Sequence, residues 1–111
     1  MAARNALLKA VPYQVEQSLK KLGANLKTAR LRRNLTTEEV AQKIGVGRFV
    51  VADAEKGKPS TGIAIYAALL WAYGLIDQFG DIADPSRDEE GTTLSLKRER
   101  ARHPRKLDND F

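Results

Sequence analysis

The stretch LTTEEVAQKIGVGRFVVADAEKG, residues 35–57, decides the fold. Thr36 and Glu39 have the spacing of a capping box, in which the threonine hydroxyl caps a helix and the glutamate reaches back to the threonine backbone. Apolar residues follow at helical spacing, and Gly45 stands where a left-handed residue commonly ends a helix. The stretch therefore predicts a helix of about two turns that begins after Thr36 and ends at Gly45.

A second short helix is predicted over residues 48–56, directly after the turn residues Val46 and Gly47. Gly57 and the nearby proline end it. Two short helices joined by a glycine-containing turn are typical of a helix-turn-helix, whose second helix enters the major groove of DNA. The alternative is a helical hairpin inside a generic bundle. The capping, the helix lengths and the small residue Ala41 between the two helices favour the helix-turn-helix.

Further helical segments flank this element on both sides. Residues 13–33 carry one apolar stripe at helical spacing and predict a helix that is interrupted near Gly23. A fourth helix follows, which Ser60 or Thr61 caps. A short fifth helix is expected over residues 75–82, where the residues to bury are Ile76, Phe79 and Ile82.

Together these segments predict an all-α fold. A five-helix domain covers residues 12–84, and a flexible arm, residues 1–11, precedes it. Asp84-Pro85-Ser86 is typical of a turn or linker. The polar and basic tail, residues 85–111, is expected to form a weak helix or to be partly disordered. The sequence contains neither an alternating strand pattern nor an internal repeat.

Length and composition restrict the class of protein. The chain has 111 residues, which suits one compact domain with extensions and is short for an enzyme with a separate substrate domain. It contains no cysteine, so disulfides and thiolate metal sites are unavailable. No segment approaches the length of apolar sequence that a membrane span needs, and no secretion signal is recognisable at the N-terminus. We therefore expect a cytoplasmic protein without a cofactor, a metal or a membrane partner.

Charge is distributed unevenly along the chain. The net charge is +5, a value that favours polyanionic partners such as nucleic acid. Residues 1–33 carry eight Lys or Arg and one Glu, a net charge of +7, whereas residues 59–96 carry a net charge of −5. The last segment, residues 97–111, is basic again, with a net charge of +3.

Three motifs resemble one known family. Leu22-Gly23 with Arg30, then LTTEEVAQKIGV, then AEKGKP, are similar to the Xre family of lambda-repressor-like domains, which are five-helix, all-α folds that bind DNA. The resemblance covers about half of the chain. It implies that Arg30 on the first helix forms a partly buried ion pair with Glu55 at the end of the third helix. Such a pair is structural, because removing either partner would leave the other charge buried and alone.

The second half of the chain resembles one branch of that family. IAIYAALLWAYGLID, ADPSRDEEG, KRERARHPRK and the terminal LDNDF are similar to HipB-like antitoxins. This resemblance implies a homodimer that represses its own operon and binds a HipA-like serine/threonine kinase toxin. Neither composition nor periodicity indicates that partner.

The second helix of the helix-turn-helix offers the candidate base-reading residues, beginning at Gly47. Arg48 is the first candidate, because its guanidinium can donate two hydrogen bonds to guanine; the alternative is a phosphate contact or a solvated charge. Phe49 either contacts a thymine methyl group or belongs to a protein interface. Asp53 either accepts a hydrogen bond from cytosine or is a surface charge. The usual polar readers are partly replaced here by Gly, Phe, Val and Ala, so readout of DNA shape is expected to contribute.

Phosphate contacts are predicted around this helix. Thr36 and Thr37 stand at the start of the preceding helix, where backbone N–H groups attract phosphate. Lys56 and Lys58 follow the predicted reading helix. Lys27 is a further candidate from the first helix.

A single domain reads only a short half-site, so an operator-binding homodimer is expected. The residues available for a self-complementary patch are Trp71, Tyr73, Leu75, Ile76 and Phe79, of which Trp71 is expected to fill the core. The basic tail has three interpretations: an arm along DNA, a segment that folds on the toxin, or a solvated end. The residues assigned to partner binding are Leu107, Asp108, Asn109, Asp110 and Phe111.

No catalytic residue is predicted, because the sequence offers one isolated histidine and neither a phosphate-binding loop nor a cluster of metal ligands. The main alternative to a DNA-binding repressor is a protein-interaction module that binds a toxin without contacting DNA. The apolar second helix of the helix-turn-helix motivates this alternative.

Overall fold

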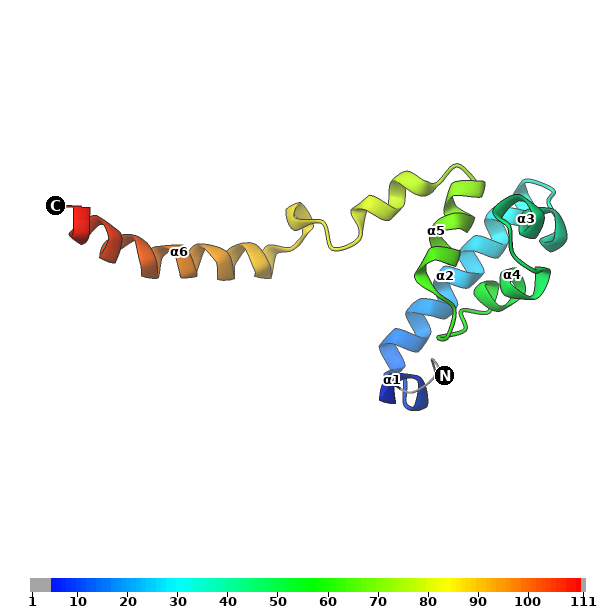
Figure 1. Ribbon diagram of the computed structural model, residues 1–111, viewed down its shortest axis with the longest axis horizontal. Helices are drawn as coiled ribbons and strands as arrows, with labels where there is room; N and C mark the ends of the chain where they lie inside the picture. The colour runs from blue at the N-terminus through cyan, green and yellow to red at the C-terminus, as the bar shows by residue number, and fades with distance from the viewer. Residues whose placement is uncertain (1–4, 111) are drawn as a thin grey trace. The chain divides into compact units, whose positions relative to one another are not determined.

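The computed structural model describes the backbone of residues 5–110 (Figure 1). It describes the side chains of residues 5–102. Every regular element in this part of the chain is a helix. The predicted all-α fold is therefore confirmed. The chain forms two compact units that divide between Phe79 and Gly80. The domain limits expected from the sequence, 12–84 and 85–111, remain a prediction.

The first unit contains five α-helices and the beginning of a 3-10 helix whose last two residues belong to the second unit. The first α-helix is a single turn inside the segment expected to be an arm. Asn5 caps this helix by accepting a hydrogen bond from the Leu8 amide at 3.0 Å. The elements are α1 (Ala6–Lys9), α2 (Tyr13–Arg32), α3 (Thr37–Ile44), α4 (Arg48–Glu55), α5 (Ile63–Ala72) and η1 (Ile76–Asp81).

The core lies where α2, α3, α4 and α5 meet. Each helix supplies at least one fully buried aliphatic side chain, and these are Leu26, Val40, Val51 and Leu69. The helix α4 packs against α2, α3 and α5. Because it has neighbours on several sides, the position of α4 is set by the core rather than by the flanking loops.

The helix α2 continues through Gly23 without interruption, in contrast to the expectation from the sequence. A Cβ atom at Gly23 would lie 2.5 Å from the carbonyl oxygen of Glu55 and 2.6 Å from that of Ala54. The glycine therefore leaves room for the end of α4 to lie directly on α2. This contact between distant segments, and not a break in the helix, explains the glycine.

The predicted boundaries of α3 are confirmed. Thr36 accepts a hydrogen bond from the Glu39 amide at 3.0 Å, and the Glu39 carboxylate accepts one from the Thr36 amide at 2.8 Å, which completes the capping box. Gly45 ends the helix in the left-handed conformation, with φ +81°. Local sequence fixes this helix because both of its ends are set by residues within it or next to it.

Two expectations for α5 are wrong. Its N-cap is Gly62, which has no capping side chain, rather than Ser60 or Thr61. Trp71 is 56% exposed instead of filling the core. The helix is apolar on every side, so its composition cannot indicate which face turns inward. The core takes Tyr66, Leu69, Leu70 and Tyr73, and this choice leaves Trp71 outside.

The expected fifth α-helix is a 3-10 helix, η1, that covers Ile76–Asp81. Only Phe79 of its three expected core residues packs against the core. Ile76 and Ile82 are exposed, so their predicted burial is wrong.

The second unit begins at Gly80 and contains η2 (Pro85–Arg87) and α6 (Glu89–Asp110). Asp84 starts η2 by accepting hydrogen bonds from the amide and the hydroxyl of Ser86, both at 2.9 Å. These bonds lower the pKa of the Asp84 carboxyl group. The tail was expected either to form a weak helix or to be partly disordered, and the structure has a helix over Glu89–Asp110. The side chains of residues 103–110 lie outside the described part.

Candidate nucleic-acid interface

The helices α3 and α4 form the two halves of the candidate interface. Gly45, Val46 and Gly47 join them, and the amides of Gly45 and Val46 both donate to the carbonyl of Ala41, at 2.9 and 3.0 Å. Val51 and Ala54 of α4 are fully buried. A short turn and a buried inner face therefore fix α4 relative to α3.

Arg30 and Glu55 fix the other end of α4. The Arg30 guanidinium donates to both Glu55 oxygens, at 2.6 and 3.0 Å, and also to the carbonyl of Leu35 at 2.8 Å. The side chains are only 10% and 7% exposed, and the hydrogen bonds to Glu55 raise the pKa of Arg30. The pair joins α2 to the last residue of α4, so it is an anchor for α4 rather than a contact for a ligand.

Tyr73 lies beside this anchor with its ring in the core. Its hydroxyl group is buried and has no hydrogen-bond partner, and burial raises its pKa to about 12. The guanidinium of Arg33 lies 5.7 Å from the centre of the Tyr73 ring. Tyr73 is therefore unavailable for the self-complementary patch expected from the sequence.

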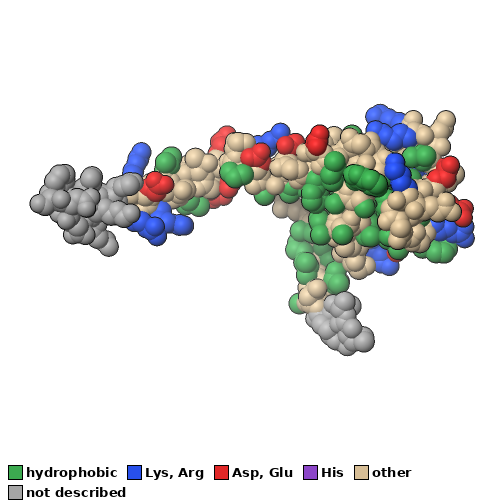
Figure 2. Space-filling model, turned by 45° about the horizontal axis from the view of Figure 1, so that its top comes forward, with side chains coloured by type: hydrophobic (Ala, Val, Ile, Leu, Met, Phe, Trp, Pro, Cys, Tyr) green, Lys and Arg blue, Asp and Glu red, His purple; other side chains and the backbone are tan. Residues whose placement is uncertain are grey.

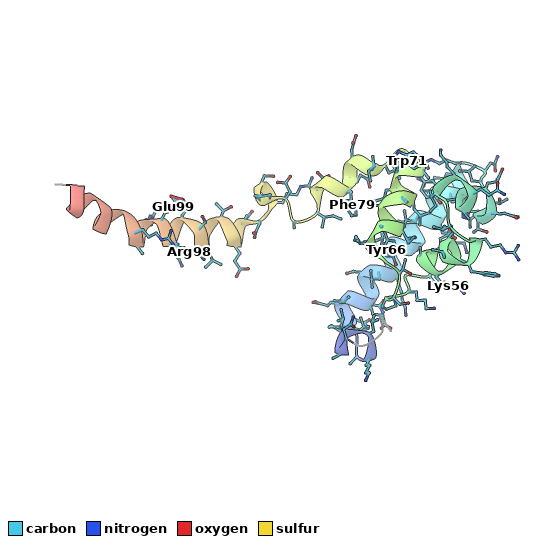
Figure 3. All side chains as sticks on the ribbon, in the orientation of Figure 1. Lys56, Tyr66, Trp71, Phe79, Arg98 and Glu99 are labelled. Carbon is cyan, nitrogen blue, oxygen red and sulfur yellow. The ribbon has the colours of Figure 1, made fainter. Side chains whose placement is uncertain are left out.

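The outward face of α4 is formed by an outer stripe, which we define as Phe49, Ala52, Asp53 and Lys56. These residues follow the spacing of one helix face. Phe49 is 71% exposed, Ala52 and Asp53 are half-buried, and Lys56 is exposed at the end of α4 (Figure 3). The stripe therefore begins with an aromatic ring and ends with a cation.

Arg48 lies beside the outer stripe rather than in it, because it precedes Phe49 and is about 100° away around the helix. Its guanidinium carbon lies 5.1 Å from the centre of the Phe49 ring. Gly47 caps α4 with backbone alone, and a Cβ there would meet no atom within 4 Å. The start of α4 is thus open on the side where Arg48 and Phe49 lie.

Asp53 is close to a cation. Its carboxylate lies 3.5 Å from the Lys58 ammonium group, and both side chains are partly exposed. Such a pair contributes little to stability, about 0–1 kcal/mol. It does offset the charge of Asp53, which would otherwise repel DNA phosphates, and it gives the carboxylate a partner other than a base.

The remaining predicted phosphate contacts have less support from the geometry. The Thr36 hydroxyl oxygen already caps α3, and Thr37 is half-buried. Glu38 and Glu39 occupy the first turn of the same helix, where their charges oppose phosphate. Lys27 is exposed on α2, one helical turn after Gly23. The structure therefore groups Arg48, Lys56 and Lys58 around α4 and leaves Lys27 on a separate helix.

The residues assigned to partner binding in the tail lie outside this description. The side chains of Leu107, Asp108, Asn109 and Asp110 are not among those described, and Phe111 lies beyond the described residues. The described cations of the tail, among them Arg98 on α6 (Figure 3), are exposed.

A family model described as a helix-turn-helix domain matches residues 21–78, which are 58 of the 111 residues. The chain belongs to this family. The helix-turn-helix domain is of the Xre and lambda-repressor type, in agreement with the resemblance seen in the sequence, and it indicates a DNA-binding regulator. No curated protein matches the chain. In the described part, none of the helices combines the length and apolar content needed to cross a membrane.

Of the outer stripe, Phe49, Asp53 and Lys56 were already candidates in the sequence, and their contacts with DNA remain a prediction. One contact of this domain could not be predicted from the sequence. The Lys43 ammonium group lies 5.6 Å from the centre of the Trp71 ring. That contact joins residues far apart in the sequence, so no local pattern could reveal it.

Proposed function

We propose that this chain is a transcriptional repressor in the cytoplasm, which binds operator DNA as a homodimer with α4 in the major groove. The observation that carries the proposal is the outward-facing outer stripe, with Phe49 and Lys56 exposed, on a helix whose inner face and far end are fixed by Val51, Ala54 and the Arg30–Glu55 pair. A rigid helix with an exposed face is what base reading requires.

Binding would combine base contacts with phosphate contacts. Arg48 and Phe49 stand at the start of α4, which is the end that reaches base edges in helix-turn-helix complexes. Lys56 and Lys58 stand at its other end, where they can neutralise phosphates on the groove edge. Each phosphate neutralised adds about 0.9 to the slope of log affinity against log salt concentration.

The test is fluorescence anisotropy with a duplex from the promoter of this chain's own operon, at several salt concentrations. We expect Arg48→Ala to weaken binding to this duplex more than binding to unrelated DNA. We expect Lys56→Ala to lower the salt slope by about 0.9 on either duplex. Lys21→Ala is the matched control, since Lys21 is exposed on the opposite side of α2 from the contact with α4.

The homodimer is supported by exposed apolar residues on α5. Hydrophobic side chains gather over this helix (Figure 2), and Ile63 and Trp71 are 68% and 56% exposed. Exposed apolar patches often mark interaction sites. Sedimentation velocity is expected to show a dimer for the unaltered chain and a monomer for Ile63→Lys. A monomer in both cases would contradict the dimer.

We further propose that this repressor is the antitoxin of a HipBA-type operon and neutralises a HipA-like kinase toxin. The support for this step is the resemblance of the α5 segment and the tail to HipB-like antitoxins. The test is to purify the chain from its native host and to assay any co-purifying protein for serine/threonine kinase activity with and without the chain. Deleting residues 97–111 is expected to weaken capture of the kinase more than DNA binding.

A second candidate is a protein-interaction module that binds a toxin without contacting DNA. Phe49 and Val50 favour it, because they are 71% and 36% exposed and apolar side chains on a helix surface suit a protein partner. The anisotropy experiment separates the two candidates. Absence of binding to any duplex at low salt would favour the interaction module.

A further inference from the structure

Arg48 and Phe49 form a cation–π contact, and no other contact of this kind is described between two residues of α3 and α4. They are neighbours at the start of α4, both are exposed, and the guanidinium carbon lies 5.1 Å from the ring centre. A guanidinium near the centre of an aromatic ring is attracted by the ring electrons. The two side chains therefore meet DNA as one unit whose two parts are already next to each other.

The two parts suit two adjacent bases. A guanidinium that donates to O6 and N7 of guanine lies in the plane of that base. Stacked bases are separated by about 3.4 Å. The centre of the Phe49 ring lies 5.1 Å from the guanidinium carbon, so the ring is within reach of the neighbouring base. In the major groove, an aromatic side chain there can contact the C5-methyl group of thymine.

We propose that Arg48 and Phe49 together recognise one dinucleotide step, a 5-methylpyrimidine followed by guanine, which in unmodified DNA is TpG. This inference rests on the proposed DNA-binding function and names the step that α4 selects. The pyrimidine precedes the guanine because TG steps are easily unstacked and kinked, and this deformability admits a large ring. Asp53 does not compete for the step, since its carboxylate faces Lys58.

Recognition of the methyl group has a consequence for modified DNA. 5-Methylcytosine carries the same C5-methyl group as thymine, whereas cytosine carries hydrogen there. A methylated CpG step therefore binds as TpG does, and an unmethylated CpG step binds more weakly.

The experiment uses the full chain and starts from selection of bound sequences from a random duplex library. We expect the bound pool to be enriched in TpG steps. In one selected duplex, the thymine of that step is then replaced by deoxyuridine, which removes only the methyl group. Loss of one buried methyl group predicts about fourfold weaker binding in anisotropy measurements. Replacing the step by methylated CpG is expected to retain the affinity, and replacing it by CpG is expected to reduce it.

Protein variants assign the effect to the two residues. Phe49→Ala is expected to bind the thymine and deoxyuridine duplexes equally, because the methyl group loses its partner. Arg48→Lys retains the charge but is expected to lose most of the preference for guanine at the step. Val50→Ala is the matched control, since Val50 is an exposed apolar residue of α4 outside the outer stripe, and it should keep the fourfold difference.

Equal affinity of the unaltered chain for the thymine and deoxyuridine duplexes would overturn this inference and leave the proposed function in place. A pool without TpG enrichment would overturn it as well. Absence of binding to any duplex at low salt would instead remove the proposed function and the inference with it. The deoxyuridine substitution lies in the DNA, so the main comparison does not depend on how a variant folds.

Discussion

Replacing Glu55 by glutamine should destabilise the first unit strongly, because it leaves the Arg30 guanidinium buried without a counter-charge. The pair is nearly inaccessible to water, with side chains 10% and 7% exposed, and two hydrogen bonds join the partners. Removing one partner of a buried pair costs about 3–5 kcal/mol. Arg30 keeps its bond to the Leu35 carbonyl, so we expect a cost near 3 kcal/mol.

This cost is large compared with the total stability of a small domain, about 5–15 kcal/mol. For a domain of this size it corresponds to a fall in Tm of about 12–24 °C. The assay is urea unfolding of the full chain, followed by circular dichroism and by the fluorescence of Trp71, which is the one tryptophan of the sequence. Asp53→Asn is the control, since its exposed pair with Lys58 is worth at most about 1 kcal/mol and weakens with salt.

The double variant Arg30→Met/Glu55→Met tests the reasoning further. A buried ion pair replaced on both sides by apolar residues of similar size often costs little, so the double variant should be more stable than Glu55→Gln alone. The reasoning would be refuted if Glu55→Gln lost less than about 1 kcal/mol, or if the effects of the two single methionine variants simply added in the double variant.

Three further perturbations are expected to have distinct outcomes. Gly23→Ala should cost about 1–3 kcal/mol in urea unfolding, because its Cβ would meet the α4 carbonyls. Gly80→Ala, with open space around it, should change little, and equal effects would contradict the packing argument. Thr36→Ala should cost about 1 kcal/mol through loss of the capping box, and an unchanged Tm would argue against that role. Burial raises the pKa of Tyr73 to about 12, above its unfolded value near 10, so the stability that its neutral form contributes is complete below pH 10 and is lost as the pH rises through 12. Tyr73→Phe should therefore unfold less readily in alkali and be no less stable at pH 7. Identical alkaline unfolding of both proteins would exclude Tyr73 as the cause.

The sequence alone determined the features that depend on neighbouring residues. The ends of α3 follow from Thr36, Glu39 and Gly45, because a cap needs only residues within one turn of the helix end. The turn and the start of α4 follow in the same way. The Arg30–Glu55 contact was also foreseen, although only through resemblance to a family, since spacing along the chain carries no information about a pair 25 residues apart.

Only the tertiary structure decided which surfaces face outward and which residues meet. An entirely apolar α5 can bury any of its faces, and packing against α3 and α4 placed Trp71 outside. The uninterrupted α2 at Gly23 became explicable once the end of α4 was found to lie on it. In each case the deciding interaction is made through space, and local sequence preferences do not specify it.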